Sequence, residues 1–378
     1  MVELPSAELH KTPLHALHLK LGAKMTAFAG YDMPVHYPAG ILKEHLHTRA
    51  HAGLFDVSHM GQAVLHPRPG VDIAAAFESL TPGDIAGLSP GQMRYTQLLN
   101  ERGGILDDLM VTRHWAKDKG NALFLVVNAG RKMEDFTHIE KALTGVAVLE
   151  PLPDRALLAL QGPQAANVLA RHIPQGAALK FMHGGSFAIA SQEVIVHRCG
   201  YTGEDGFEIS LPASAAQEWA VRLLAEPEVE PVGLGARDSL RLEAGLCLYG
   251  HDIDETTTPI EANLLWSIGK RRREAGGFPG AAIIQEQIRQ GVSRLLVGVK
   301  PDGRAPAREG TEIQDQTGKK IGQITSGGFS PTLNAPIAMG YVSAAFAAPG
   351  TPLQLLVRGK LLPAHTVSLP FIPKRFHK

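Results

Sequence analysis

The chain has 378 residues, more than one hydrophobic core usually holds, so we expect two or three domains. Lys plus Arg and Asp plus Glu both number 37, giving a formal net charge of zero, so charge alone attracts neither nucleic acid nor a membrane surface. The only cysteines, Cys199 and Cys247, lack a CxxC spacing, which excludes a disulfide framework and predicts two buried, apolar thiols.

The first part of the chain predicts two short helices around a loop. Residues 1–24 show neither a signal-peptide nor a transit-peptide pattern, and no later stretch reaches the ~18 apolar residues of a membrane span, so we expect a cytoplasmic protein. Helices are expected over residues 13–21 and 41–51, with a Gly- and Pro-rich loop over 28–38 between them. In the second helix, His47 and His51 share a face and His45 lies nearby, but no carboxylate or cysteine completes a metal site with them, which favours a solvated face.

The middle of the chain alternates between strands and helices, which is typical of an α+β protein. The expected strands are 61–66, 94–100, 106–112, 123–128, 156–161, 186–190, 194–199 and 207–211. The expected helices are 74–80, 131–143, 164–172, 215–224 and 235–246. The basic run at residues 270–273 is interpreted as a solvated helix end or loop, with only a weak suggestion of an acidic carrier.

The last ~100 residues have a different sequence pattern, in which short strands alternate with Gly and Pro. These strands are expected over 295–299, 320–325, 337–342, 353–357 and 361–367. Such a pattern predicts a small antiparallel barrel or sandwich. We place the boundary before it near residues 275–290.

Several catalytic fingerprints are absent from the sequence. There is no G-x-G-x-x-G after a strand, no G-x-x-x-x-G-K-[ST], no G-x-S-x-G and no H-E-x-x-H. These absences argue against nucleotide-dependent oxidoreductases, P-loop ATPases, α/β-hydrolases and zinc proteases.

Two segments place carboxylates on expected strands. Asp107 and Asp108 are adjacent, so their side chains point to opposite faces, and parity alone leaves open which one faces a pocket or whether both shape a turn. Glu208 lies opposite the apolar face formed by Phe207 and Ile209, and meets either solvent or a polar cleft. We expect Gly206 to take a positive φ in the turn before this strand.

A third segment, residues 235–245, combines cations with a helical pattern. Arg237 and Arg241 are one turn apart and share a face, while Asp238 near the helix start complements the helix dipole. The segment is either a solvated face or an arginine fork that binds a carboxylate or a planar acceptor.

Together these segments make the chain similar to the glycine cleavage T-protein family along nearly its whole length. The matching stretches are 12–14, 29–37, 54–61, 103–109, 160–163, 198–206, 236–245, 324–328 and 339–342. The resemblance implies a three-domain cloverleaf of two interleaved α+β domains and a C-terminal antiparallel β-barrel domain. Residues 1–60 with 150–275 would form the first domain, 61–149 the inserted second, and 285–378 the barrel.

The resemblance also implies the activity. It is an aminomethyltransferase that moves a one-carbon unit from an aminomethyl-dihydrolipoyl carrier protein to tetrahydrofolate, giving 5,10-methylenetetrahydrofolate and ammonia. Tetrahydrofolate is thus a co-substrate, no metal is expected, and the protein is expected to be a monomer in loose association with its carrier.

The family's site residues fall on defined positions of this sequence. The essential aspartate falls on Asp108, the pterin-binding carboxylate on Glu208, and a ligand-contacting arginine on Arg237, which would bind either the pterin carbonyl or the folate glutamate. Further pocket positions fall on Tyr95, Met60, Asn128 and Tyr201, and Phe376 takes the place of an aromatic residue at the chain end, without the hydroxyl of some members.

Three alternatives remain. A folate-binding relative of the iron–sulfur assembly type carries K-G-C-Y-x-G-Q-E, whereas residues 198–205 here read R-C-G-Y-T-G-E-D. The demethylating type carries an additional flavin domain with a glycine fingerprint, which this sequence lacks. A non-catalytic folate-binding protein would bind the ligand without turnover.

Overall fold

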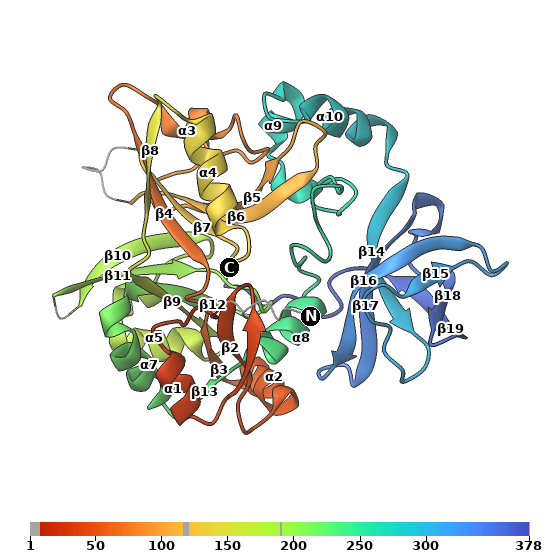
Figure 1. Cartoon of the computed structure of the whole chain (residues 1–378), viewed down its shortest axis with the longest axis horizontal. Coiled ribbons are helices and arrows are strands. Elements are labelled where there is room, and N and C mark those ends of the chain that lie inside the picture. The colour runs from red at the N-terminus through yellow and green to blue at the C-terminus, as the bar shows by residue number, and fades with distance from the viewer. Residues whose placement is uncertain (1–7, 116–120, 190, 378) are drawn as a thin grey trace, which may run out of the picture.

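The computed structural model describes residues 8–115, 121–189 and 191–377. Two α+β bodies lie one above the other on the left of Figure 1, and a β-barrel lies on the right. This arrangement confirms the α+β class and the C-terminal antiparallel barrel. Among the described helices, none combines the length and the apolar character that crossing a bilayer needs.

The first sheet takes strands from separate parts of the chain. Their order is β10 (His183–Ile189), β11 (Gln192–Arg198), β12 (Gly206–Pro212), β9 (Arg155–Gln161), β3 (Ala52–Asp56) and β13 (Val229–Pro231). One face is covered by α1 (His15–Lys20), α5 (Ala165–His172), α6 (Pro174–Ala177), η1 (Ala213–Ala215) and α7 (Ala216–Leu224). On the other face α2 (Ile41–Ala50) contacts α8 (Leu234–Glu243).

Strand β9 shows why a central strand of this sheet has apolar residues at successive positions. Leu158 and Leu160 belong to the core under α5 and α7, whereas Leu157 and Ala159 belong to a second core on the opposite face. Because side chains alternate across a strand, a strand buried on both faces needs apolar residues at every position. The second core includes Phe124 of the neighbouring sheet, so the two α+β bodies share it.

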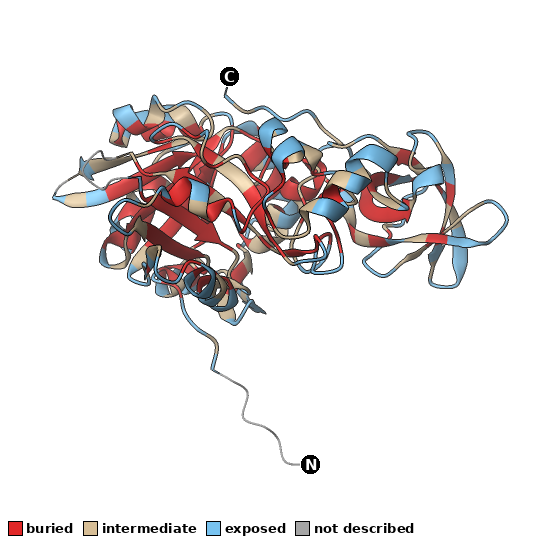
Figure 2. Ribbon diagram, turned by 90° about the horizontal axis from the view of Figure 1, so that it is seen from above, coloured by how far each residue is buried: buried red, intermediate tan, exposed pale blue. Residues whose placement is uncertain are grey.

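The second sheet is antiparallel and five-stranded. Its order is β5 (Met93–Leu99), β6 (Ile105–Arg113), β7 (Leu123–Val127), β4 (Gly61–Pro67) and β8 (Ala147–Pro151). The helices α3 (Ile73–Phe77) and α4 (Lys132–Ala142) pack their apolar sides onto it. Figure 2 shows buried residues concentrated in the strands of the two sheets.

A connecting region precedes the barrel. It contains η2 (Leu265–Ser267), α9 (Lys270–Ala275) and α10 (Ala281–Gln290). Ile284 of α10 packs with Leu99 and Ile105 of the second sheet, and the first barrel strand begins four residues after α10 ends. The first sheet and the barrel lie within the expected ranges, but β8 of the second sheet crosses the expected boundary between residues 149 and 150. The division into separate domains stays a prediction.

The basic run on α9 is only partly solvated. Arg272 is buried, and it donates to the carbonyl oxygen of Glu78 at 2.6 Å. Arg271 binds the carboxylates of Glu78 and Asp84 at 2.5 and 2.6 Å. The expectation of a solvated run was therefore wrong for Arg272, which is buried, whereas Arg271 is exposed. The carboxylates that bind Arg271 come from the segment at the end of α3, and sequence order does not reveal this pairing.

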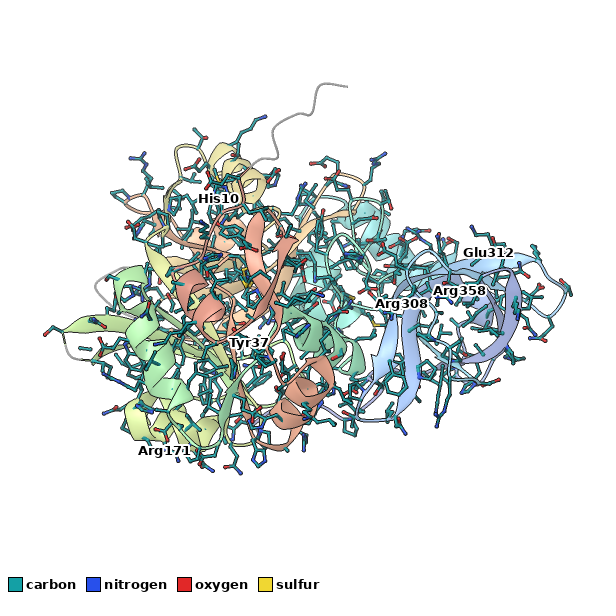
Figure 3. All side chains as sticks on the ribbon, turned by 60° about the horizontal axis from the view of Figure 1, so that its bottom comes forward. His10, Tyr37, Arg171, Arg308, Glu312 and Arg358 are labelled. Carbon is teal, nitrogen blue, oxygen red and sulfur yellow. The ribbon has the colours of Figure 1, made fainter. Side chains whose placement is uncertain are left out.

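The C-terminal barrel is closed by six antiparallel strands. Around it run β14 (Arg294–Pro301), β17 (Ala335–Ser343), β16 (Lys320–Ser330), β15 (Glu312–Gln314), β18 (Pro352–Val357) and β19 (Lys360–Val367), with η3 (Ala344–Phe346) after β17. Arg308, Glu312 and Arg358 mark it in Figure 3. The five expected strands are confirmed, whereas β15 was missed because it has only three residues.

Two local expectations were wrong. Residues 28–38 are not a loop, because β1 (Lys24–Phe28) and β2 (Tyr31–His36) form a hairpin whose turn residues Ala29 and Gly30 have φ of 48° and 80°. Gly203, not Gly206, takes the positive φ before β12. Gly206 is needed for a different reason: a Cβ there would lie 2.5 Å from the carbonyl oxygen of Leu160.

A buried polar network joins α2 to α8 and the barrel. Glu243 accepts hydrogen bonds from His45 at 3.1 Å, from Arg49 at 2.8 Å and from Ser330 at 2.5 Å. Neither His45 nor Glu243 has exposed side-chain surface. The expected solvated histidine face was thus wrong for His45, because α2 is covered by α8 and by the end of β16.

The end of the chain returns from the barrel to the centre of the molecule (Figure 1). Arg375 donates its backbone N–H to the carbonyl oxygen of Gly203 at 2.8 Å. Its guanidinium binds Glu204 at 2.6 Å and the carbonyl oxygen of Arg49 at 2.7 Å. These contacts hold the last residues against the first sheet.

Candidate functional site

A cavity of about 860 Å³ lies where the three bodies meet. Asp108 and Asn128 come from the second sheet, Glu208 and Arg237 from the first body, and Phe376 from the chain end. Pockets for ligands of drug size have volumes of ~300–1,000 Å³ and are mostly apolar with a few polar groups. The cavity therefore has the size and the composition of a site for a substantial organic ligand.

Strand β6 decides which aspartate faces the cavity. Asp107 has no exposed surface and alternates with the buried Leu109 and Val111, whereas Asp108 and Met110 line the cavity. Both aspartates lie within the strand, since Asp108 pairs with Gln97 and Asp107 with Leu98 of β5. The interpretation as a turn is therefore wrong, and the position of Asp108 agrees with the resemblance.

Asn128, just after β7, connects the two carboxylates. Its Nδ2 donates to Asp108 Oδ1 at 2.7 Å and to Asp107 Oδ1 at 2.9 Å, and its backbone N–H donates to Asp107 Oδ2 at 3.3 Å. These bonds fix the orientation of Asp108. Burial and the nearby charge of Asp107 raise the pKa of Asp108 to about 7. Hydrogen bonds from Tyr95 and Asn128 lower this pKa, but their effect is smaller.

Glu208 faces the cavity from β12. Phe207 and Ile209 on either side of it point into the opposite core, as strand alternation requires. Glu208 is 8% exposed, and burial raises its pKa while the charge of Arg237 and a hydrogen bond from the Cys199 thiol lower it. A carboxylate with so few protein partners has free lone pairs for donors of a ligand.

Arg237 of α8 supplies the cation opposite Glu208. Its guanidinium lies over the ring of Tyr201, 4.8 Å from the centroid, and the Tyr201 hydroxyl donates to the carbonyl oxygen of Cys247. Among the described residues no carboxylate forms an ion pair with Arg237. Burial lowers the pKa of Arg237, whereas the charge of Glu208 raises it. Its N–H groups are therefore available to an acceptor on a ligand.

Arg241 has a different role. Of the two alternatives for this helix face, the arginine fork does not form, and the solvated face is wrong for Arg241, which is buried. It binds Asp252 at 2.7 Å, Ser326 at 2.8 Å and Asp238 at 2.8 Å. These bonds tie α8 to the barrel strand β16. Only Arg237 of the two lines the cavity, because packing against the barrel takes Arg241 away from it.

Aromatic rings form much of the cavity wall. Tyr95 stacks on Trp266 with centroids 5.3 Å apart, and Phe376 stacks on Phe181 at 4.4 Å. Met60 and Tyr201 line the same space, so all the expected pocket residues are brought together.

Several wall residues were missed by the sequence analysis. Trp266, Phe181, Phe28 and Lys374 all line the cavity. They lie in a three-residue 3₁₀ helix, in a loop, at the end of a strand and in the terminal segment, where neither periodicity nor a motif marks them. Cys199 and Cys247 are free and buried as expected, and both also line the cavity.

A metal site would need several His, Cys, Asp or Glu side chains close together in the part of the chain that the structure describes. No group of three or more His, Cys, Asp or Glu side chains there has a geometry suited to a metal ion. The expectation that the protein uses no metal stays a prediction.

Two family descriptions match the sequence. Residues 14–272 match the family described as "GCVT N-terminal domain", and residues 294–372 match "Glycine cleavage T-protein C-terminal barrel domain". Together the two matches cover both α+β bodies and the barrel.

Individual proteins match over nearly the whole chain. A relative from Dictyostelium discoideum named "Aminomethyltransferase, mitochondrial" is 46% identical to this chain, and the alignment covers 99% of this chain and 95% of the relative. The protein of the same name from Gallus gallus is 49% identical, covering 98% and 94%. The crystal structure of glycine cleavage system aminomethyltransferase T from Bartonella henselae superposes with a TM-score of 0.92. Its sequence is 48% identical, and the match covers 98% of this chain and 100% of that one.

Proposed function

The chain belongs to the glycine cleavage T-protein family and is an aminomethyltransferase, and on that premise we propose that its central cavity binds tetrahydrofolate and the aminomethyl-dihydrolipoyl group of a carrier protein. The products are 5,10-methylenetetrahydrofolate, ammonia and the reduced carrier. The observation that carries this proposal is that Asp108, Glu208 and Arg237, from separate elements, line one cavity with aromatic walls.

The cavity suits a folate in three respects. Its volume of about 860 Å³ accommodates a ligand of that size. The Tyr95–Trp266 and Phe181–Phe376 pairs offer flat surfaces for the ring systems. Glu208 and Arg237 supply a carboxylate and a cation for polar groups that a flat ligand carries on its edges.

Glu208 acts in recognition. Its carboxylate accepts hydrogen bonds from the ring N–H and the amino group on one edge of the reduced pterin, each worth roughly 1.5–3 kcal/mol before costs. Arg237 binds an acceptor on the same substrate, the pterin carbonyl or the glutamate. The cavity-facing position of both side chains supports this assignment.

Asp108 acts in the chemistry. Held by Asn128 at 2.7 Å, it orients the folate nitrogens and stabilises the positive charge that develops as ammonia leaves. A carboxylate ~4 Å from such a charge, at an effective dielectric constant of ~20, contributes about 4 kcal/mol, or about a thousandfold in rate. A carboxyl group with a pKa of about 7 also exchanges protons readily near neutral pH, as moving the folate N–H protons to the leaving groups requires.

The test is the complete transfer reaction with purified protein, an aminomethyl-loaded lipoyl carrier and tetrahydrofolate. We expect ammonia and methylenetetrahydrofolate in equal amounts. Tight folate binding without either product would instead show a folate-binding protein without catalysis. The full-length similarity to aminomethyltransferases favours the transferase over the folate-binding relatives of other function.

Partner, assembly and location remain part of the proposal. A lipoyl carrier is the expected partner, and the protein is expected to work as a monomer, which light scattering of the purified protein tests. The relatives named above from Dictyostelium and Gallus are mitochondrial by name, so their names do not support the expected cytoplasmic location. Cell fractionation decides the compartment.

A further inference from the structure

His59 is a buried histidine of the cavity wall that the proposed reaction does not use. It lies between β3 and β4, is 4% exposed and lines the cavity. Its Nδ1 is enclosed by protein without a hydrogen-bond partner, and its Nε2 bonds none of the residues that the structure describes. Since folded proteins rarely leave a buried polar side chain without a partner, this side chain needs an explanation.

Two further histidines have a buried ring nitrogen without a partner in the described part of the chain, and neither lines the cavity. His197 packs against Phe124, with ring centroids 5.2 Å apart. His138 lies on α4 and is partly buried. Of the three, only His59 can therefore find its missing partner on a ligand bound in the cavity.

The neighbours of His59 hold its ring in place. Phe28, at the end of β1, meets the ring edge-on with centroids 5.6 Å apart. Lys132 donates from Nζ to the carbonyl oxygen of His59 at 3.1 Å and to the hydroxyl of Tyr31 at 2.6 Å, which ties this segment to α4 and to the β1–β2 hairpin. A side chain that its neighbours already fix loses little conformational freedom when a ligand binds to it.

The His59 imidazole is neutral near neutral pH. Burial lowers its pKa to about 4, and the charge of Asp56 raises this pKa whereas those of Arg237 and Lys132 lower it. A neutral imidazole has one N–H and one nitrogen lone pair. Because an enclosed N–H without an acceptor is rare in folded proteins, the proton belongs on Nε2, which is not closed off as Nδ1 is. His59 therefore offers a hydrogen-bond donor.

The donor of His59 and the cation of Arg237 need the same kind of partner. Both residues line the cavity, and Arg237 lies close enough for its charge to act on His59. Among the described residues Arg237 has no carboxylate in an ion pair, so N–H groups of both residues are available to an acceptor. Glu208 is instead an acceptor for donors of the ligand. The wall formed by His59 and Arg237 thus suits an oxygen atom with free lone pairs.

We propose that His59 is a further folate-binding residue, whose Nε2–H donates a hydrogen bond to a carbonyl or carboxylate oxygen of the substrate beside Arg237. The inference rests on the proposed binding of tetrahydrofolate in the cavity. It adds a donor to the recognition by Glu208 and Arg237, and it gives a partner to a side chain that the protein leaves unpartnered.

The experiment measures tetrahydrofolate binding by titration calorimetry, and the transfer reaction, for His59→Phe and His59→Gln. Phe keeps a ring that packs on Phe28 and removes both nitrogens. We expect folate affinity to fall about tenfold, because an oxygen of the bound ligand is left without its donor. The KM should rise in proportion with kcat within about twofold, as for a bond present before and during the reaction. Gln places an amide N–H near the position of Nε2, so we expect it to recover most of the affinity.

His138→Phe is the matched control, because it also removes a ring with a buried, unpartnered nitrogen but does not change the cavity wall. We expect wild-type affinity for this variant. Tetrahydropteroate, which lacks the glutamate, distinguishes the two kinds of acceptor. An effect of His59→Phe of equal size on both ligands places the oxygen on the pteroyl part, and an effect on tetrahydrofolate alone places it on the glutamate.

Nitrogen NMR of protein with ¹⁵N-labelled histidine supplies a second test if the Phe variant does not fold. The signals of His59 are those that disappear in the Gln variant. We expect the proton on Nε2, and a shift of the Nε2 signal when tetrahydrofolate binds. A proton on Nδ1, or His59 signals that do not respond to tetrahydrofolate, would contradict the proposal.

The outcomes separate this inference from the proposed function. A wild-type protein that binds no tetrahydrofolate would remove both ideas. Affinity that is weakened by Glu208→Gln but unchanged in a folded His59→Phe protein would overturn the role of His59 alone. Equal losses in the Phe and Gln variants would also contradict it, because they would show that the imidazole shapes the wall rather than donates to the ligand.

Discussion

Replacing Glu208 with Gln tests how the cavity recognises its folate substrate. Glu208 is 8% exposed, and its carboxylate has only the Cys199 thiol and the Arg237 charge acting on it, so most of its lone pairs are free for a ligand. In Gln one acceptor becomes an N–H₂ donor that faces a donor of the pterin edge. The variant keeps the volume of the side chain and leaves the cavity wall intact.

The size of the effect follows from the bonds lost. One charge-assisted hydrogen bond is worth roughly 1.5–3 kcal/mol, and a buried donor left unpaired costs ~1–3 kcal/mol. A net loss of about 3 kcal/mol weakens binding on the order of a hundredfold, since ~1.4 kcal/mol corresponds to tenfold. The loss appears mainly in the KM for folate, because the bonds exist before and during the reaction.

Titration calorimetry with tetrahydrofolate measures this effect directly. Glu218→Gln on α7 is the matched control, since its side chain is 65% exposed and pairs with Arg222 on the surface. We expect wild-type affinity for the control and a melting temperature near that of wild type for both variants. Unchanged affinity in a folded Glu208→Gln protein would refute the assignment of Glu208 to the pterin.

Three further predictions concern the scaffold around the site. A Cβ at Gly104 would lie 1.9 Å from the carbonyl oxygen of Glu255, so Gly104→Ala should lower the free energy of unfolding, measured in urea, by ~1–3 kcal/mol. Gly303→Ala is the control: a Cβ at Gly303 would have no atom within 4 Å, so this change should alter the free energy of unfolding little. Burial opposes ionisation of Glu243, but its hydrogen bonds and the adjacent cation lower its pKa from 4.5 to about 2. The ionised Glu243 carboxylate therefore contributes stability of order 3 kcal/mol, which is present above pH 4.5 and lost as the pH falls toward 2. Glu243→Gln should make the free energy of unfolding depend less steeply on pH on the acid side. The same acid-side slope in the variant and in wild type would contradict this. Arg375→Ala removes the anchor of the chain end, so folate affinity should drop several-fold with little change in kcat, and an unchanged dissociation constant would count against a role of Phe376 in binding.

The sequence predicted most of the elements because their apolar patterns reflect burial. The run 156–160 is apolar because β9 is covered on both faces. The first hairpin escaped prediction, since Pro34 lies within β2 and its turn uses a positive φ at Ala29, a residue that seldom adopts one.

The candidate site shows where sequence reasoning ends. Strand parity placed Asp107 and Asp108 on opposite faces but did not say which face is the cavity, and only the packing of β6 against β7 and α4 decides it. Trp266 and Lys374 reach the cavity through tertiary folding of the short helix η2 and of the chain end, so no local pattern marks them. Arg241 shares a helix face with Arg237, yet its contacts with the barrel give it a structural role.

The central claim is that Glu208 recognises the folate while Asp108 carries the chemistry. The most direct measurement is a single-turnover transfer from the loaded carrier to tetrahydrofolate with Asp108→Asn, together with calorimetry on the same protein. Asn keeps the shape of the side chain and removes its charge, so we expect the transfer rate to fall about a thousandfold and folate affinity to remain within a few-fold of wild type. A near-normal transfer rate in a folded Asp108→Asn protein would contradict the account.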